Sequence, residues 1–433
     1  MKTISLLILL GSLVFPLRAQ ETWTLERCIQ YGLVHNTGIR RQELEIAARK
    51  ADLRQKQFAH LPLVGIQLTQ GANWGRSVDM QELVIIRNKL TQATGASLNL
   101  SLPLFDGLSR HNTRLAARES LEAAQLDAGT LARSLTRDIT RAWVELMLAR
   151  QLHACTRESY ATIVTQRERT AQLVAAGSQP QSALHEMDAQ VASEKAAEIE
   201  AASRVRTALL TLGRLMNLSP EEVLTVDDSL DDEALARSIP YLSHTQVEDW
   251  LWQDPRIQST RRHITEAEHL HAAAKGAFLP SLSVTAGYGT YYSSAAEGAF
   301  FTQLDENRNP SLSFQLTIPV FDAMQRVSQA RKSRLALEMS RLEAETVRIQ
   351  VEEEIRSATI EAENGCQKYL SAQETLQAMQ ELLSVTEAKY NLGAASVLDY
   401  LIARNHHTQA VSDFLQAKWQ YLFQLKLLEQ YRP

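Results

Sequence analysis

Histidine is the residue type in this chain whose spacing comes closest to a metal-binding pattern. His263, His269 and His271 lie within the segment RRHITEAEHLHAAAK, and His406 is followed directly by His407. A helical zinc site has two histidines four positions apart, on one face of the helix. His269 and His271 are two positions apart and would point in different directions on a helix. The sequence therefore predicts no metal site.

Acidic residues and glycines do not form a catalytic pattern either. The runs at 352–354 and 227–232 are typical of a solvated helix face and of a loop. The chain contains neither a Gly-rich phosphate loop nor a G-x-S-x-G nucleophile elbow. We expect no enzymatic activity and no cofactor.

Composition excludes one further class of function. The chain has 433 residues, with 45 Lys and Arg against 50 Asp and Glu, and a formal charge of −5. No basic stripe indicates nucleic-acid binding. Three scattered cysteines, Cys28, Cys155 and Cys366, do not form a disulfide framework, so we expect them to be buried structural residues.

The N-terminus has the pattern of an export signal. Met1-Lys2 precedes the apolar run Ile4–Phe15, and Ala19 supplies a small residue for cleavage. We predict a signal peptide over residues 1–19, without a cysteine for lipid attachment at its cleavage site. After residue 20 no segment reaches the ~18 apolar residues of a transmembrane helix. The mature protein should be exported, and either soluble or embedded in a membrane by another route.

Two short segments, ASLNLSLPLFDG at 96–107 and PSLSFQLTIPVFDA at 310–323, share an alternating pattern and a Phe-Asp ending. Their prolines, Pro103 and Pro319, are 319 − 103 = 216 positions apart, and Gly177 and Gly393 have the same offset. Repetition at a fixed offset indicates duplication. We predict two homologous halves, at about 20–235 and 236–433.

Each half should contribute two β-strands, at about 61–71 and 96–104 and at about 279–289 and 311–320. Apolar residues alternate there with Ser, Thr, Gln, Asn and Gly, which is the period of a strand. A tilted strand needs about 9–11 residues to cross a bilayer. These segments therefore have the length and the two faces of transmembrane strands.

Long helices account for most of the remaining chain. No proline interrupts 106–176 or 322–392, and Asp106 and Asp322 are suited to accept hydrogen bonds from first-turn amides as N-caps. About 70 residues at ~1.5 Å each give a helix of ~105 Å. Shorter helices are expected at about 24–59 and 181–216. Such lengths predict a coiled-coil tube or rod.

The four strands leave two architectures open. In water the sheet would have to bury its apolar face, as in a secreted structural or adhesive coiled-coil protein. In a bilayer it could leave no open edge, because unpaired amides in hydrocarbon are costly. Four strands cannot close a barrel, whereas three copies would supply 3 × 4 = 12 strands around a lumen.

The order of these features resembles the TolC family of outer-membrane efflux proteins over essentially the whole mature chain. The similarity includes the Thr24-Leu25-Glu26 helix start, Asn36, and turns at Gly177 and Gly393. It also includes two P-x-F-D junctions, whose residues are Pro103, Phe105 and Asp106 and then Pro319, Phe321 and Asp322. The resemblance implies a mainly α-helical homotrimer with a 12-stranded β-barrel in the Gram-negative outer membrane and a helical periplasmic tunnel.

The same resemblance implies partners and a gate. The tunnel tip, with Gly177 and Gly393, would dock a periplasmic adaptor that links it to an inner-membrane RND or ABC pump. Asp399 matches the first acidic gate position of the family, whereas Ile402 and Ala183 occupy positions that can be acidic. Glu186, one turn from Ala183, could substitute, and Tyr390 matches the tyrosine thought to hold such tunnels shut. One ring of three aspartates is therefore expected.

The segments between the strands should be cell-surface loops, at 72–96 and 290–309. They are expected to be variable, and the sequence assigns them no receptor role. The identity of the exported substrate and the energy source of the pump also stay open.

Overall fold

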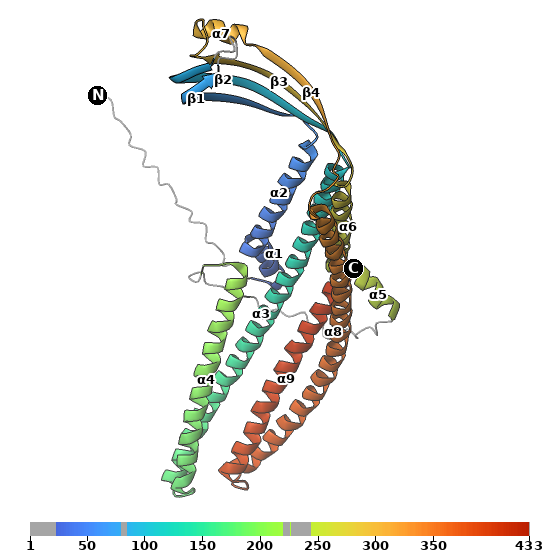
Figure 1. Cartoon of the computed structure of the whole chain (residues 1–433). Coiled ribbons are helices and arrows are strands. Elements are labelled where there is room, and N and C mark those ends of the chain that lie inside the picture. Colours follow the sequence, from blue (N-terminus) through green and yellow to red (C-terminus); the bar gives the residue numbers. More distant parts are fainter. Residues whose placement is uncertain (1–22, 79–84, 220–225, 227–243, 433) are drawn as a thin grey trace, which may run out of the picture. The chain divides into compact units, whose positions relative to one another are not determined.

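A computed structural model describes residues 23–78, 85–219, 226 and 244–432 (Figure 1). The predicted signal peptide at 1–19 and the predicted boundary at 235/236 lie outside the described residues. The chain is mainly α-helical, with one small antiparallel sheet, as expected. None of the helices in the described part is long and apolar enough to cross a membrane.

The order of the elements is nearly the same in the first and second parts of the chain. Two helices, two strands, a 67-residue helix and a shorter helix follow one another twice, and the second series has one additional short helix. This order is what a duplication would produce. The first series is α1 (Leu25–His35), α2 (Thr37–Phe58), β1 (Leu63–Val78), β2 (Ile85–Asp106), α3 (Ser109–Ala175) and α4 (Gln181–Met216). The second is α5 (His244–Gln253), α6 (Pro255–Gly276), β3 (Ser281–Ser293), α7 (Phe300–Glu306), β4 (Asn309–Thr317), α8 (Gln325–Asn391) and α9 (Val397–Tyr431).

The pairing register of the strands places apolar side chains beside apolar ones and small polar side chains beside small polar ones. The strands of the sheet are in the order β1-β2-β3-β4, and all neighbours are antiparallel. One row across the four strands is apolar, and the next row is small and polar. The apolar row is Val64, Leu100, Ala286 and Leu312, and the polar row is Gly65, Asn99, Gly287 and Ser311. The sheet therefore has one apolar and one polar face, as the alternation predicted.

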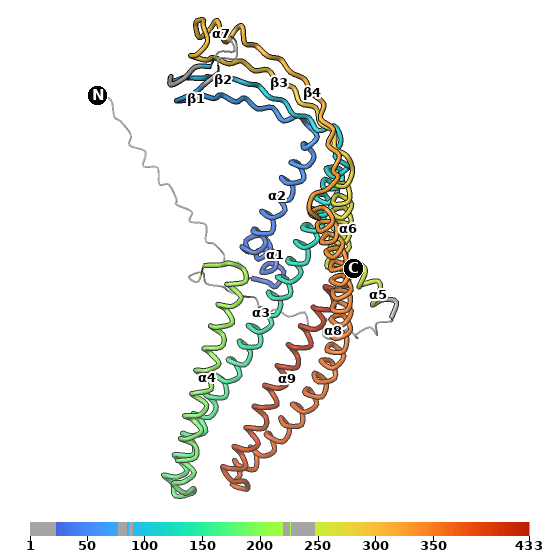
Figure 2. The backbone as a smooth tube through the Cα atoms, viewed as in Figure 1, coloured from blue at the N-terminus to red at the C-terminus, as the bar shows by residue number. Residues whose placement is uncertain are grey.

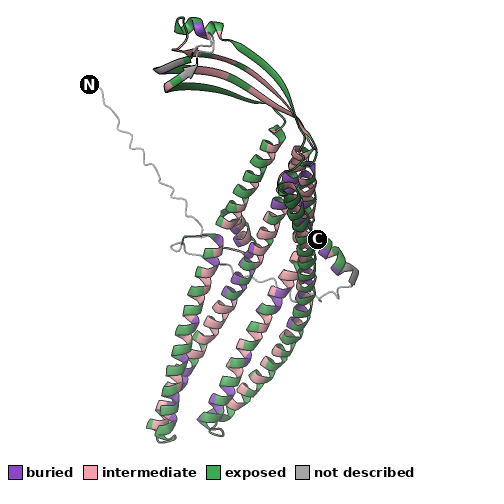
Figure 3. Cartoon of the chain, viewed as in Figure 1, coloured by how far each residue is buried: buried purple, intermediate pink, exposed green. Residues whose placement is uncertain are grey.

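The apolar face of this sheet is not covered in the single chain. Ile66, Leu68, Phe314 and Leu316 are all exposed large hydrophobic side chains. Exposed apolar areas of this extent on a sheet indicate contact with lipid or with another protein surface. Figure 3 shows the strands mostly in the exposed and intermediate colours.

The prediction of a loop over 72–96 was largely wrong. β1 continues to Val78 and β2 begins at Ile85, and the two pair as far as Val78↔Ile85 with a register shift between Gly75 and Ser77. Backbone hydrogen bonds can extend a hairpin without any side-chain alternation, so the lack of regular alternation in this segment concealed the strands. The predicted loop 290–309 likewise contains the end of β3, the helix α7 and the first residue of β4.

The chain forms two compact units. The first contains the sheet, with Arg41–Leu131 and Ser243–Ile355. The second contains α1 and the far halves of the long helices, with the chain up to Arg40, Ala132–Leu242 and Arg356–Arg432. Within this second unit, α3 runs beside α4 and α8 beside α9 as two hairpins (Figure 2).

The second unit has two hydrophobic cores. The larger one surrounds Ile139, Leu146 and Trp143, whose ring packs edge-on against that of Trp419 at 5.8 Å. The smaller one lies near the hairpin turns and contains side chains from all four helices, including Ile163, Met187, Tyr390 and Leu401. The four-helix end of the chain is therefore a packed structure within one subunit.

Candidate functional site at the tip and the junctions

The hairpin turns predicted from Gly177 and Gly393 are real turns of one type. Both glycines have a left-handed backbone, with φ of 74° and 76°. Ser178 N donates to Leu173 O at 2.9 Å, and Ala394 N donates to Lys389 O at 2.8 Å. This is the Schellman ending of a helix, in which glycine avoids the cost of a Cβ. The two turns define the tip of the chain.

Asp399 lies in the first turn of α9 and forms a reciprocal cap with Ser396. Its backbone N–H donates to Ser396 Oγ at 3.1 Å, and its carboxylate accepts from Ser396 N at 3.0 Å and from Ser396 Oγ at 2.6 Å. These hydrogen bonds lower the pKa of the Asp399 carboxyl group. The side chain is exposed. Asp399 is thus an accessible, charged group at the tip that also stabilises its own helix.

Tyr390 is buried, and its hydroxyl lies 3.3 Å from Thr170 Oγ1 on α3. Its ring stacks on that of Tyr400 at 5.3 Å. Tyr390 therefore joins α8 to α3 and α9 within the tip. A role in holding the tip together is compatible with this position and remains a prediction.

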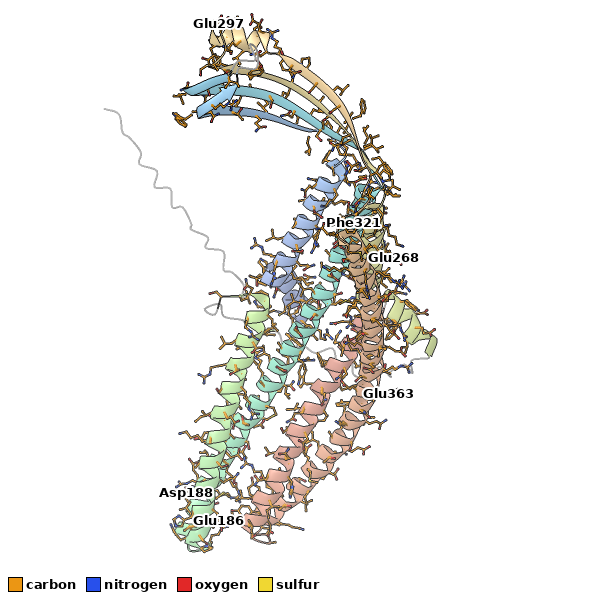
Figure 4. All side chains as sticks on the ribbon, viewed as in Figure 1. Glu186, Asp188, Glu268, Glu297, Phe321 and Glu363 are labelled. Carbon is orange, nitrogen blue, oxygen red and sulfur yellow. The ribbon has the colours of Figure 1, made fainter. Side chains whose placement is uncertain are left out.

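Glu186 lies on α4 near the turn, close to Asp188 along the helix (Figure 4). Its side chain is exposed, whereas that of Ala183 is buried in the tip core. Asp188 forms an ion pair with Arg167 of α3 at 2.8 Å. Glu186 is thus available as a second acidic group at the tip, and its role in a gate remains a prediction.

Arg404 is a residue of the tip that the sequence reasoning missed. It lies on α9, is buried, and one terminal nitrogen donates to the carbonyl oxygen of Ser159 at 2.5 Å and to its hydroxyl at 2.6 Å. The same nitrogen lies 3.9 Å from the carboxylate of Glu194 on α4. Arg404 is seven positions after Val397 and three after Leu401, so it lies on the same face of α9 as these two core residues. This spacing could have predicted that Arg404 is buried.

The two strand-to-helix junctions share one pattern of hydrogen bonds. Asp106 Oδ2 accepts from the backbone N–H of Arg110 at 3.0 Å and from its Nε at 2.9 Å. Arg110 Nη1 also donates to Ala59 O, just after α2. At the second junction, Asp322 accepts from Arg326 in the same way, and Arg326 Nη1 donates to Ala277 O just after α6. The second set of distances is 3.0, 2.6 and 3.4 Å.

This geometry corrects one prediction. Asp106 is the last residue of β2, and Asp322 lies three positions before α8, so neither is at the N-cap position itself. A turn with positive φ at Leu108, Ala323 and Met324 separates each aspartate from its helix. The carboxylates nevertheless accept first-turn amides, as predicted, and the partner arginines were not foreseen.

Gly107 makes the first junction especially tight. It has φ of 66°, and a Cβ placed on it would overlap the carbonyl oxygen of Gly276 and lie 2.8 Å from the carbonyl carbon. A Cβ on Gly276 would in turn lie 3.2 Å from the carbonyl carbon of Gly107. Two backbones therefore cross here without side chains between them. The prolines mark the same region: Pro103 lies at a register shift of β2, and Pro319 follows β4.

Exposed apolar side chains lie at both junctions. Phe321 is 83% exposed and Val320 is 92% exposed, and Phe105 and Leu104 are also exposed. Figure 4 labels Phe321. An exposed aromatic residue at the end of a strand is typical of the boundary between membrane and water.

Among the described residues, no three His, Cys, Asp or Glu side chains are placed so that they could hold a metal ion together. His271 instead has its Nδ1 2.9 Å from the hydroxyl of Ser333, and His263 lies 3.2 Å from the carboxylate of Glu266.

Comparison with known proteins assigns the chain to a family. The family model for outer membrane efflux protein matches residues 29–218 and 247–431. The chain belongs to the outer membrane efflux protein family. Among curated proteins, it is 22% identical over 317 residues to the outer membrane efflux protein BepC of Brucella suis biovar 1 (strain 1330). That match covers 73% of this chain and 66% of the relative, slightly under two thirds of its length.

Solved structures of the family share the fold. The Campylobacter jejuni CmeC outer membrane channel superposes with a TM-score of 0.80 at 18% identity, over 94% of this chain and 85% of that one. The open state of the Neisseria gonorrhoeae MtrE outer membrane channel gives 0.77 at 19% identity, over 94% and 88%. The family match places the chain in the outer membrane.

Proposed function

We propose that this efflux family member is the outer-membrane exit duct of a tripartite system that exports small molecules. It would act as a homotrimer, without chemistry of its own, and receive substrate from an inner-membrane pump of the RND or ABC type through a periplasmic adaptor. The family match supports this proposal. It leaves the alternative, a secreted adhesive coiled-coil protein, without support.

The observation that carries the proposal is the open, one-sided sheet. β1 and β4 are its outer strands, and each has one row of backbone groups without a neighbour in the described sheet. In hydrocarbon such groups would cost several kcal/mol each. Pairing β4 of one copy with β1 of the next satisfies both edges, and three copies give a closed ring of twelve strands. The polar face would then line the lumen, and the apolar face would contact lipid.

A fractionation experiment tests this assembly. The protein should remain with outer membranes after washing in salt, require detergent for release, and migrate as a trimer in mild SDS that converts to monomer on heating. Release as a monomer in buffer without detergent would refute the assembly. An efflux assay then tests the function. A strain without the duct should become more sensitive to toxic small molecules, and the plasmid-borne gene should restore resistance.

We further propose that Asp399 forms a ring of three carboxylates that controls the tip. The side chain is exposed and charged, and its cap with Ser396 fixes it at the start of α9. Divalent cations should block the channel in planar bilayers through this ring. Asp399→Asn keeps a hydrogen-bond acceptor for the cap but removes the charge, so it should abolish the block with little loss of stability. Asp399→Ala should also weaken the helix start. Unchanged block in Asp399→Asn would remove Asp399 as the gate.

A further inference from the structure

The end of β3 extends beyond β4, and the helix α7 lies beside it in place of a strand. β4 begins at Asn309, which is opposite Gly289, whereas β3 continues to Ser293. Ser294 N donates to Gln92 O of β2, so the even-numbered residues at this end direct their backbone groups to β2. The odd-numbered residues therefore direct theirs to the side on which β4 is missing. An open edge of this kind is a template for pairing with another strand.

Two side-chain amides of the β3–β4 connection close this edge. Gln303 Oε1 accepts from Ser293 N at 2.9 Å, and Gln303 Nε2 donates to Ser293 O at 3.2 Å, as a neighbouring strand would. Asn307 Nδ2 donates to Tyr291 O at 2.8 Å. Gln303 is 1% exposed and also lies 3.2 Å from two carbonyl oxygens of the loop before α7. These contacts fix α7 where β4 would continue if it were longer (Figure 1).

The fixed helix still has exposed side chains. Phe300 packs against Tyr292 of β3, with 4.8 Å between the ring centroids, whereas the adjacent Phe301 is 81% exposed. Glu306, at the end of α7, is exposed, whereas Asp305 beside it forms an ion pair with Arg308. An aromatic ring and a carboxylate are thus what α7 offers to a surface that lies beyond β4.

The repeat offsets indicate which surface that is. Thr94 of β2 is opposite Tyr292 of β3. The equivalent positions are 94 + 216 = 310 in β4 and 292 − 218 = 74 in β1. In the proposed ring, this register places Pro310 opposite the neighbouring subunit's Trp74. β1 continues from there to Val78, so its last residues have α7 beside them and no strand.

The end of β1 has side chains that complement those of α7. Trp74 is 74% exposed, and Arg76 is also exposed. An aromatic pair stabilises a contact beyond the area that it buries. A pair of opposite charges at the rim of an interface fixes orientation more than it adds affinity. Phe301 and Glu306 therefore match the neighbouring β1 in both respects.

We propose that α7 of each subunit docks on the end of β1 in the neighbouring subunit, with Phe301 and Glu306 meeting Trp74 and Arg76. This inference rests on the proposed trimeric duct and adds a helix-to-strand contact to the pairing of β4 with β1. The contact extends the interface past the point where β4 begins. Gln303 is a positioning residue for it, because it holds α7 against β3.

A cross-link between subunits tests the contact. Glu306→Cys and Arg76→Cys are combined in one chain, and outer membranes that contain it are treated with a short bis-maleimide. We expect covalent dimers and trimers that survive boiling in SDS. The native cysteines stay in place, and each single variant shows any link that they form. A trimer that is present in mild SDS but gives no covalent species would overturn the inference.

A matched pair controls for non-specific linking. Ile66 lies on β1, ten positions before Arg76, which is about 33 Å along a strand. Glu306→Cys combined with Ile66→Cys should therefore give no covalent dimer. Equal linking of both pairs would also overturn the inference, because it would show that the reagent does not distinguish the end of β1 from its middle.

Exchange of the charges tests recognition without a reagent. Glu306→Arg and Arg76→Glu should each lower the temperature at which the trimer converts to monomer in SDS. The chain with both substitutions should regain most of this loss, because opposite charges face each other again. A decrease in the double variant equal to the sum of the two single decreases would count against the contact.

Gln303→Ala tests the positioning of α7. It removes the hydrogen bonds to Ser293, so the yield of the cross-link between positions 306 and 76 should decrease. The amount of trimer should not change, because β4 and β1 can still pair. Thr302→Ala, at an exposed position of the same helix, should leave the yield unchanged. An undiminished yield in Gln303→Ala would remove Gln303 from this role.

Failure of this inference and failure of the proposed function give different results. A chain that is released from membranes as a monomer refutes the ring itself. A stable trimer without the cross-link leaves the ring intact and refutes only the docking of α7, and Phe301 would then face lipid or water.

Discussion

Substitution of Gly107 by alanine should destabilise the chain more than a typical glycine substitution. A residue with a Cβ at φ 66° costs about 1 kcal/mol of backbone energy. The Cβ would also overlap the carbonyl group of Gly276, which belongs to the backbone of another element and can yield only if α6 shifts. Overpacking of this kind costs about 1–3 kcal/mol. The expected total is therefore about 2–4 kcal/mol.

A matched variant separates the two contributions. Gly177 has φ of 74°, yet a Cβ there would meet nothing within 4 Å. Gly177→Ala should therefore show only the backbone cost, about 1 kcal/mol. Unfolding entropy of about 2.1 cal/mol/K per residue gives about 0.9 kcal/mol/K for a chain of this size, so each kcal/mol lowers Tm by about 1 °C.

The assay is circular dichroism of the detergent-solubilised protein during heating, at one protein concentration and one heating rate. We expect a decrease in Tm of about 2–4 °C for Gly107→Ala and about 1 °C for Gly177→Ala. Equal decreases would refute the argument, because they would show that the carbonyl of Gly276 moves aside without cost and that the crossing does not constrain the junction.

Three further predictions concern the same unit. The hydrogen bond with Glu266 raises the pKa of His263 above its ordinary 6.5. The contact should therefore stabilise the folded chain below pH 6.5 and lose this effect as the pH rises. We expect the Tm difference between wild type and His263→Gln to shrink between pH 6 and 8. Arg326→Met should lower the Tm at neutral pH, because it removes the hydrogen bonds from the side chain to Asp322 and to Ala277 O and leaves only the backbone N–H bond to Asp322. Phe321→Asp should reduce the amount of assembled protein recovered from outer membranes, because a charge replaces an aromatic ring that is 83% exposed at the end of the sheet region; unchanged recovery would exclude a role in membrane contact.

Local sequence patterns predicted the elements well where side chains carry the signal. Alternation over 311–320 and the unbroken run over 322–392 correspond to β4 and α8 within a few residues. The pairing of 85–95 with β1 could not be predicted in this way, because backbone hydrogen bonds extend the hairpin through a sequence without regular alternation. Similarly, Asp322 was recognised as a partner of first-turn amides, whereas its contact with Arg326 depends on a turn whose positive φ values the sequence does not reveal.

Tertiary contacts account for what was missed at the tip and the junction. Arg404 and Ser159 are 245 positions apart, and the crossing of Gly107 with Gly276 joins the first half of the chain to the second. A glycine at 107 was visible in the sequence as a small residue after Phe-Asp. The reason that it must be glycine became visible only with the backbone of α6 beside it.

The predicted duplication would give this crossing a consequence for assembly. The offset of 216 pairs Gly107 with Ala323, and the Leu-Pro offset of 218 pairs Gly276 with Phe58. In the proposed ring of repeats, the second junction of one subunit would therefore meet the end of α2 in the neighbouring subunit, with Ala323 facing Phe58. Both of these residues have a Cβ, so the two backbones cannot approach as closely as at Gly107 and Gly276. In that ring the tight crossing would lie within a subunit and the wider one between subunits, so the junction would be held more firmly inside each subunit than across its boundaries.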